Sequence, residues 1–111
     1  KAEYFQTKLG KCMAVETKND DTLKLAQKYG AVIAIRKDSS GGHIRIKARP
    51  DAELDLKDLA DEIKLIDSTG TWYYHPSGKM LINGSRKHRQ QKASPLSLEQ
   101  VIELVKKVYG N

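Results

Sequence analysis

The chain has 111 residues, of which 39% are hydrophobic and 31% charged, and it carries a formal net charge of +6. This length provides a real core for one domain and excludes a second domain. No apolar run reaches the roughly 20 residues that a spanning helix requires, so we expect no membrane segment. The single cysteine, Cys12, excludes an internal disulfide framework and is compatible with a cytoplasmic location. The first residue, Lys1, indicates a trimmed terminus or a domain excised from a longer protein.

A strand and a helix are predicted first along the chain. Residues 11–17 form a short mixed run with the character of a strand. Asp20 or Asp21 is placed to cap a helix that ends at Gly30, because glycine readily takes the left-handed conformation that terminates helices. The buried face of this helix is expected to hold Leu25, Ala26 and Tyr29.

A buried strand and an amphipathic strand follow, joined as a hairpin. Residues 31–35 are apolar throughout, which indicates a strand buried on both faces in the middle of a sheet. Residues 38–42 have turn chemistry, and residues 43–49 alternate with a period of two. The alternation turns Ile44, Ile46 and Ala48 inward. It lines the opposite face with His43, Arg45, Lys47 and Arg49.

The next element is a helix with an acidic outer face. Pro50 closes the preceding strand, and Asp55 is placed to cap the helix. Its apolar residues recur at the spacing of an amphipathic helix: Leu56, Leu59, Ala60 and Ile63. Half of the 14 acidic residues lie between residues 51 and 67, so the charges of the chain are segregated.

Two strands with aromatic side chains are predicted after this helix. Residues 71–75 and residues 79–83 flank a short turn, which indicates a second hairpin. Because side chains alternate along a strand, Tyr73 is expected to point away from the face that holds Trp72 and Tyr74. At least one of these rings enters the core.

A final helix completes an α+β domain. Ser97 and Gln100 form a capping box, and Gly110 ends the helix. Its apolar stripe is Leu98, Val101, Ile102, Val105 and Val108. The element order predicts a single domain with a mixed, mostly antiparallel sheet and about three helices packed on one face.

The candidate binding residues are cations and aromatic rings. No acidic residue lies between Asp67 and Glu99, so this segment attracts polyanions unless it is only a solvated basic loop. The rings are expected to stack on bases. The candidates are Arg45, Lys47, Arg49, Lys79, Arg86, Lys87, Arg89 and Lys92, with Trp72 and Tyr74 as the rings.

Known catalytic and cofactor patterns are missing from the sequence. The histidines and Cys12 do not have the spacing of a zinc site, and no glycine-rich phosphate loop or nucleophile elbow occurs. We therefore expect no metal and no cofactor. His75, at a strand end before a proline, is the catalytic candidate, either as a general base or as a histidine that only bonds its turn. Asn83 and Gly84 begin either an anion-binding nest or an ordinary turn.

Several segments together resemble the DHH-associated C-terminal domain of RecJ-like phosphoesterases. They are residues 31–35, the hairpin into residues 44–49, the helix over residues 55–60, and His75-Pro76 with Gly78. The resemblance implies a domain that grips a nucleic acid or nucleotide, with Arg49 and His75 at the corresponding positions. The family's glycine run is replaced by Trp72-Tyr73-Tyr74, and no catalytic aspartate-histidine module precedes the domain.

The leading hypothesis is a non-catalytic domain that binds nucleic acid or a phosphorylated nucleotide. A parent-chain catalytic domain is then a possible partner. The first alternative is a small phosphoesterase or nuclease with His75 as base and with Arg49 or Lys79 stabilising charge. The second is a protein-interaction module whose acidic segment, residues 51–67, docks on a basic partner.

Overall fold

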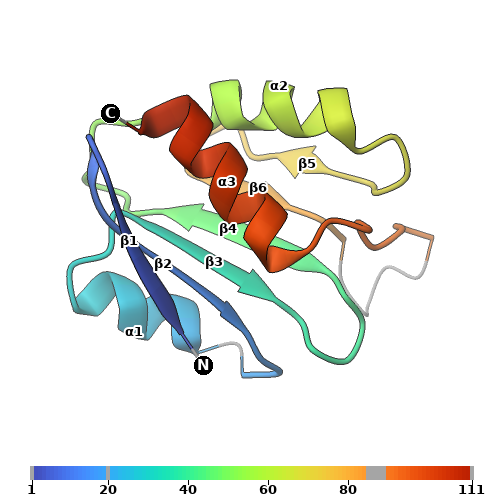
Figure 1. Ribbon diagram of the computed structural model, residues 1–111, viewed down its shortest axis with the longest axis horizontal. Helices are drawn as coiled ribbons and strands as arrows, with labels where there is room; N and C mark the ends of the chain where they lie inside the picture. The colour runs from blue at the N-terminus through green and yellow to red at the C-terminus, as the bar shows by residue number, and fades with distance from the viewer. Residues whose placement is uncertain (1, 20, 85–89, 111) are drawn as a thin grey trace.

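A six-stranded mixed sheet crosses the whole molecule in the computed structural model, which describes residues 2–19, 21–84 and 90–110 (Figure 1). Its strands are β1 (Glu3–Thr7), β2 (Gly10–Glu16), β3 (Ile33–Lys37), β4 (Ile44–Ala48), β5 (Tyr73–Tyr74) and β6 (Met80–Ile82). The helices are α1 (Thr22–Lys28), α2 (Lys57–Ile66) and α3 (Leu98–Tyr109). The strand order is β1-β2-β3-β4-β6-β5. Among the described strands, only β2 and β3 run parallel. The predicted α+β class, with a mixed and mostly antiparallel sheet, is confirmed.

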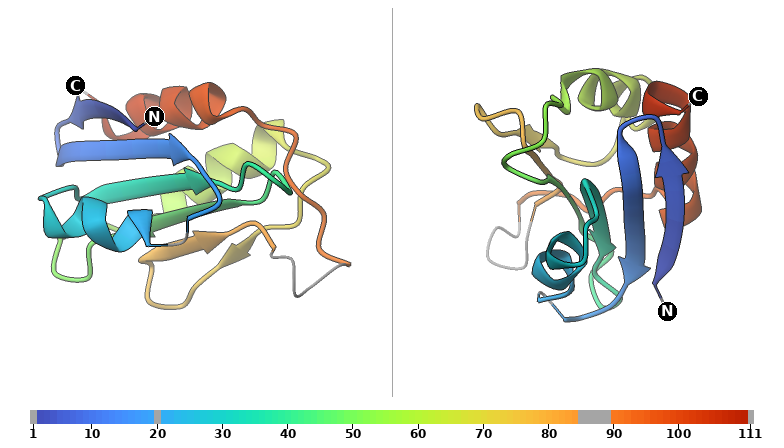
Figure 2. Two further views of the ribbon diagram at one scale, coloured as in Figure 1. Left: turned by 90° about the horizontal axis from the view of Figure 1, so that it is seen from below. Right: turned by 90° about the vertical axis from the view of Figure 1, so that its left-hand side faces the viewer.

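The helices lie on both faces of the sheet, which corrects the expectation of a single covered face. Helices α2 and α3 cover one face, and α1 packs on β3 from the other side (Figure 2). The reason is that β2 and β3 are apolar on both sides. Their α1 side carries Met13, Val15 and Ala34, which form a small core with Leu23 and Ala26 of α1. The larger core lies between the sheet and α2 and α3.

Strand β1 was not predicted. It pairs with β2 as a hairpin whose register joins Thr7 to Gly10 and Phe5 to Cys12. Its side chains give little strand signal, because most of them are exposed at the edge of the sheet and only Thr7 is buried. Phe5 packs against the main core from the edge.

Helix α1 buries a different face from the one expected. Leu23 and Ala26 are its buried residues, whereas Leu25 is 48% exposed and Tyr29 is 68% exposed. The helix has only seven residues and packs on β2 and β3 through Leu23 and Ala26, so Leu25 and the following Tyr29 stay in solvent. Asp21 precedes the helix, but its side chain makes no capping hydrogen bond.

The other predicted packing patterns are confirmed. Along β4, Ile44, Ile46 and Ala48 are buried, and Arg45 and Lys47 between them are partly exposed. The capping box at the start of α3 is present, with the Ser97 hydroxyl accepting from the Gln100 amide at 3.1 Å. The predicted buried residues of α2 and α3 are in the core: Leu56, Leu59, Ala60, Ile63, Val101, Ile102 and Val105. Leu98 and Val108 pack against that core while partly exposed.

Candidate functional site

The pairing of β4, β6 and β5 places a cation beside an aromatic ring. Arg45 of β4 lies directly opposite Ile82 of β6, which in turn lies opposite Tyr73 of β5. Directly opposed residues in antiparallel strands point to the same face. Arg45, Ile82 and Tyr73 therefore form one row across three strands, and Tyr73 is 50% exposed.

A second row runs beside the first on the same face. Lys47 lies opposite Met80, and the His75 amide donates to the Met80 carbonyl at 3.0 Å, which continues the ladder past β5. The Tyr73 and His75 rings stand edge to face, with centroids 6.2 Å apart. We call the surface formed by the two rows the open face. Its residues are Arg45, Lys47, Tyr73, His75, Met80 and Ile82.

The open face lies on the α1 side of the sheet but beyond the reach of α1. Figure 2 shows α1 over the β3 side, while no helix in the described part of the chain lies over β5 and β6 on this side. The Gln27 side chain marks the border, because its amide donates to the Lys47 carbonyl at 3.2 Å. Arg36 of β3, opposite Arg45, is buried at 8% exposure and donates to the Thr17 carbonyl at 3.1 Å.

The tautomer of the neutral His75 ring follows from its turn. The Ser77 amide N–H donates to His75 Nδ1 at 3.0 Å, and the Ser77 hydroxyl lies 2.9 Å from the same nitrogen. A backbone N–H can only donate, so Nδ1 accepts, and the neutral ring carries its proton on Nε2. In this tautomer Nε2 is a donor. The geometry favours binding an anion over the general-base role, which needs a lone pair on that atom.

The two rings predicted to stack on bases lie on the opposite side of the sheet. Trp72 and Tyr74 pack against the main core, with partial exposure. The Trp72 indole N–H donates to Asp67 at 2.8 Å, and the Tyr74 hydroxyl donates to Asp55. This bond to the Asp55 carboxylate raises the pKa of Tyr74 to about 12. The structure brings neither ring to the cations of β4, and it places Tyr73 there instead.

Three predicted cations lie outside the open face. The Lys79 ammonium donates to the carbonyls of Ala52 and Leu54, so it holds the loop before α2. Arg49 forms an exposed ion pair with Asp51 at 2.7 Å. Lys92 is exposed, and its backbone bonds to Thr71. Arg86, Lys87 and Arg89 lie outside the described residues.

A buried polar network supports the aromatic hairpin from behind. Asp67 accepts from the Gly70 amide at 2.7 Å, from the Ser94 hydroxyl at 2.6 Å and from the Trp72 indole. Asn83 is fully buried and bonds to the same segments. Asn83 therefore serves as an internal tie. Its side chain is not offered to an anion.

Acid should weaken this network. Burial is the largest influence on Asp67 and opposes its charge, but the hydrogen bonds from Gly70, Ser94, Trp72 and Thr69 together outweigh it and lower the pKa. A lowered folded-state pKa contributes stability that is complete above the unfolded pKa of about 3.9 and is lost as pH falls through the folded value. We expect Asp67→Asn to cost about 1 to 3 kcal/mol at pH 7.

The difference in unfolding free energy between wild type and Asp67→Asn should shrink as the pH is lowered below about 4. Urea denaturation at a series of pH values measures it. A difference that stays constant down to pH 2 would contradict the assigned role of the charged carboxylate.

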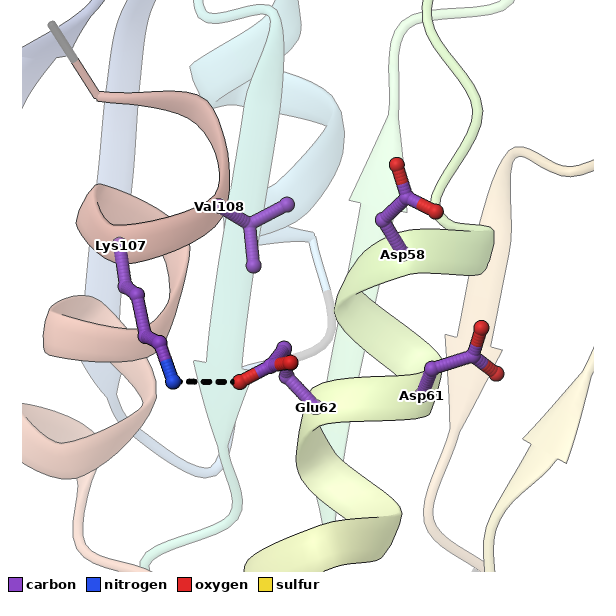
Figure 3. A pocket seen from close by; sticks show the side chains of 5 residues that line it. All are labelled: Asp58, Asp61, Glu62, Lys107 and Val108. Atoms are coloured by element: carbon purple, nitrogen blue, oxygen red, sulfur yellow. Dashed lines mark hydrogen bonds and ion pairs between the residues drawn. The ribbon is translucent and has the colours of Figure 1, made fainter.

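The acidic face lies on the other side of the molecule, in a groove between α2 and α3 (Figure 3). Glu62 pairs with Lys107 at 2.7 Å, and Asp61 pairs with Lys57 at 3.1 Å. These ion pairs offset the negative charge of two carboxylates that line the groove. Asp58 and Val108 complete its lining.

Comparisons with protein-family models, with curated proteins and with solved structures found no match. The resemblance to the DHH-associated domain therefore stays a prediction. The two residues that carry it, Arg49 and His75, are both engaged in local turns. Within the described ranges, no helix is long and apolar enough to cross a membrane, and no three His, Cys, Asp or Glu side chains group as metal ligands.

Tyr73, Met80 and Ile82 were not among the candidate site residues. Their signal is present in the sequence, since Tyr73 was expected to point away from Trp72 and Tyr74. Its neighbours could be found only from the pairing of β4 with β6, a contact between segments more than 30 residues apart.

Proposed function

We propose that the domain binds nucleic acid or a phosphorylated nucleotide through its open face and performs no chemistry of its own. The observation that carries the proposal is the row in which Arg45 and the exposed ring of Tyr73 flank Ile82. A cation row beside an exposed ring is what a ligand with both phosphate and base requires.

The spacing of the open face fits such a ligand. Arg45 and Lys47 are two residues apart on β4, about 7 Å along the strand. Two strand spacings, about 10 Å, separate these cations from Tyr73. Phosphates would lie over β4, a base would stack on Tyr73, and Met80 and Ile82 would form the apolar floor between them.

The polar groups around the ring support an anionic ligand. His75 presents its Nε2–H next to Tyr73, and a donor of this kind bonds phosphate oxygens without needing a charge. No carboxylate belongs to the two rows. Contacts to phosphates supply affinity with little selectivity for sequence, so we expect binding that weakens steeply with salt.

Tyrosine substitutions test the proposal with a matched pair. Tyr73→Ala should weaken the binding of a fluorescein-labelled single-stranded oligonucleotide by about 1 to 3 kcal/mol, which is the usual worth of one base stacked on an aromatic ring. Tyr29→Ala removes another exposed tyrosine, the residue that follows α1. Fluorescence anisotropy at low salt measures both.

The control variant should bind as the wild type does. Equal affinities for Tyr73→Ala and Tyr29→Ala would remove Tyr73 from the site. An absence of binding by the wild type at low salt would remove the proposed function altogether.

A further inference from the structure

The two edges of the sheet differ in how they are protected. The edge strand β5 has two residues and is followed within two positions by Pro76, which blunts an edge. The strand at the other edge, β1, has five regular residues and contains neither proline nor lysine. Such an edge is a ready template for another strand.

Tyr4 and Gln6 direct the hydrogen-bonding groups of their backbone out of this edge. The Lys11 carbonyl accepts from the Val32 amide at 2.8 Å, so it points toward β3 and away from β1. Gln6 is the partner of Lys11 in the antiparallel ladder. In such a pair the backbone N–H and C=O groups of both residues point away from the partner strand, so those of Gln6 point out of the sheet edge. These groups alternate in direction along a strand, so those of Tyr4 point outward as well.

We propose that β1 pairs antiparallel with β1 of a second copy of this chain, about a two-fold axis at Tyr4. This interface is separate from the open face and does not depend on the proposed function. In this register the two Tyr4 residues lie opposite each other. Glu3 lies opposite Phe5 of the second copy, and Ala2 lies opposite Gln6 of the second copy.

Charge complementarity selects this register. The Lys106 ammonium of α3 lies 5.7 Å from the centroid of the Phe5 ring in the same chain and 3.6 Å from the exposed carboxylate of Glu103, a surface pair that leaves the ammonium partly exposed. Because Glu3 comes to lie beside Phe5 of the second copy on the same face, its exposed carboxylate meets Lys106 of that copy. The two-fold axis makes this contact twice. An isologous interface requires such self-complementarity.

The opposite face of the joined strands contributes apolar contact. Tyr4 is 57% exposed and borders a hollow of about 250 Å³ between β1, β2 and α1. Exposed Leu25 of α1 and Tyr29, which follows the helix, line the same hollow. Pairing about Tyr4 brings a second tyrosine ring to its rim and covers part of this apolar surface.

Cysteine cross-linking tests the register. In Tyr4→Cys the two introduced residues lie opposite each other, with Cα atoms about 5.5 Å apart, which suits a disulfide. In Gln6→Cys the introduced residue lies opposite Ala2 of the second copy, so it should not cross-link. The native Cys12 is fully buried, and burial raises the pKa of its thiol, so it should not interfere.

With mild oxidant, the Tyr4→Cys protein should become a covalent dimer on a non-reducing gel, and the Gln6→Cys protein should stay monomeric. Equal cross-linking of the two variants, or none in either, would overturn the proposed register.

Exchanging the charges of Glu3 and Lys106 tests the interface without an introduced cysteine. We expect the wild type to sediment as a dimer and Glu3→Lys and Lys106→Glu to sediment as monomers. The variant that carries both substitutions should regain the dimer, because it restores opposite charges across the axis. Circular dichroism confirms that each variant is folded. A wild type that stays monomeric up to roughly 1 mM, or a double variant that does not recover, would overturn the proposal.

Discussion

Replacing Asn83 by alanine should cost about 3 to 5 kcal/mol of unfolding free energy. Its amide nitrogen donates to the Thr71 carbonyl at 2.8 Å and to the Lys92 carbonyl at 3.0 Å. Its amide oxygen accepts from the Ser94 amide at 2.8 Å and from the Ile44 amide at 3.3 Å. Truncation leaves the Thr71 carbonyl and the Ser94 and Ile44 amides without this partner, and the last two bonds are buried. The Lys92 carbonyl keeps the Thr71 amide N–H as a donor at 3.0 Å. Each group left unsatisfied by such a change costs about 1 to 3 kcal/mol.

Urea denaturation followed by circular dichroism measures the loss. Gln90→Ala is the control, because that amide side chain is exposed and lies in the same connection between β6 and α3. It should change stability by less than about 0.5 kcal/mol. If the two variants were equally stable, Asn83 would not be the tie that joins the aromatic hairpin to the following segment.

Removing both cations of β4 should have the largest effect on binding. In Arg45→Ala/Lys47→Ala, the affinity for a single-stranded oligonucleotide should fall by roughly two to four orders of magnitude at low salt, since two bonds to charged groups are removed and each is worth about 1.5 to 3 kcal/mol. The dependence on salt should also become shallower, because two phosphate contacts contribute a slope of about 1.4 in log K against log salt.

The matched control removes the same charge from the other side of the molecule. Lys57 and Lys64 are exposed residues of α2, so Lys57→Ala/Lys64→Ala lowers the net charge equally without touching the open face. This control separates a site from a general attraction to a basic protein. Equal losses in the two double variants would show that only net charge matters and would contradict the assignment.

The strand β4 shows how far sequence patterns reach in this protein. Its alternation predicted the buried side and the basic side correctly, because a period of two depends on the strand alone. The buried strand β3 was also predicted from its apolar run, but it spans Ile33–Lys37 where residues 31–35 were expected. The strand β1 was not predicted, because an edge strand needs little apolar surface.

The ring on the open face could not be chosen from the sequence. Alternation separated Tyr73 from Trp72 and Tyr74, but the side on which the cations lie depends on the register between β4 and β6. Asn83 was equally hard to interpret. A polar residue before glycine is typical of a turn, and its burial follows from segments that arrive later in the chain.

Mapping of the ligand on the folded protein tests the central claim most directly. In ¹⁵N-HSQC titrations with a short single-stranded oligonucleotide at low salt, we expect the largest amide shifts at Arg45, Lys47, Tyr73, Met80 and Ile82. The amides of α2 and α3 around the acidic groove should move least. Shifts that gather on α2 and α3, or a spectrum that does not change, would contradict binding at the open face.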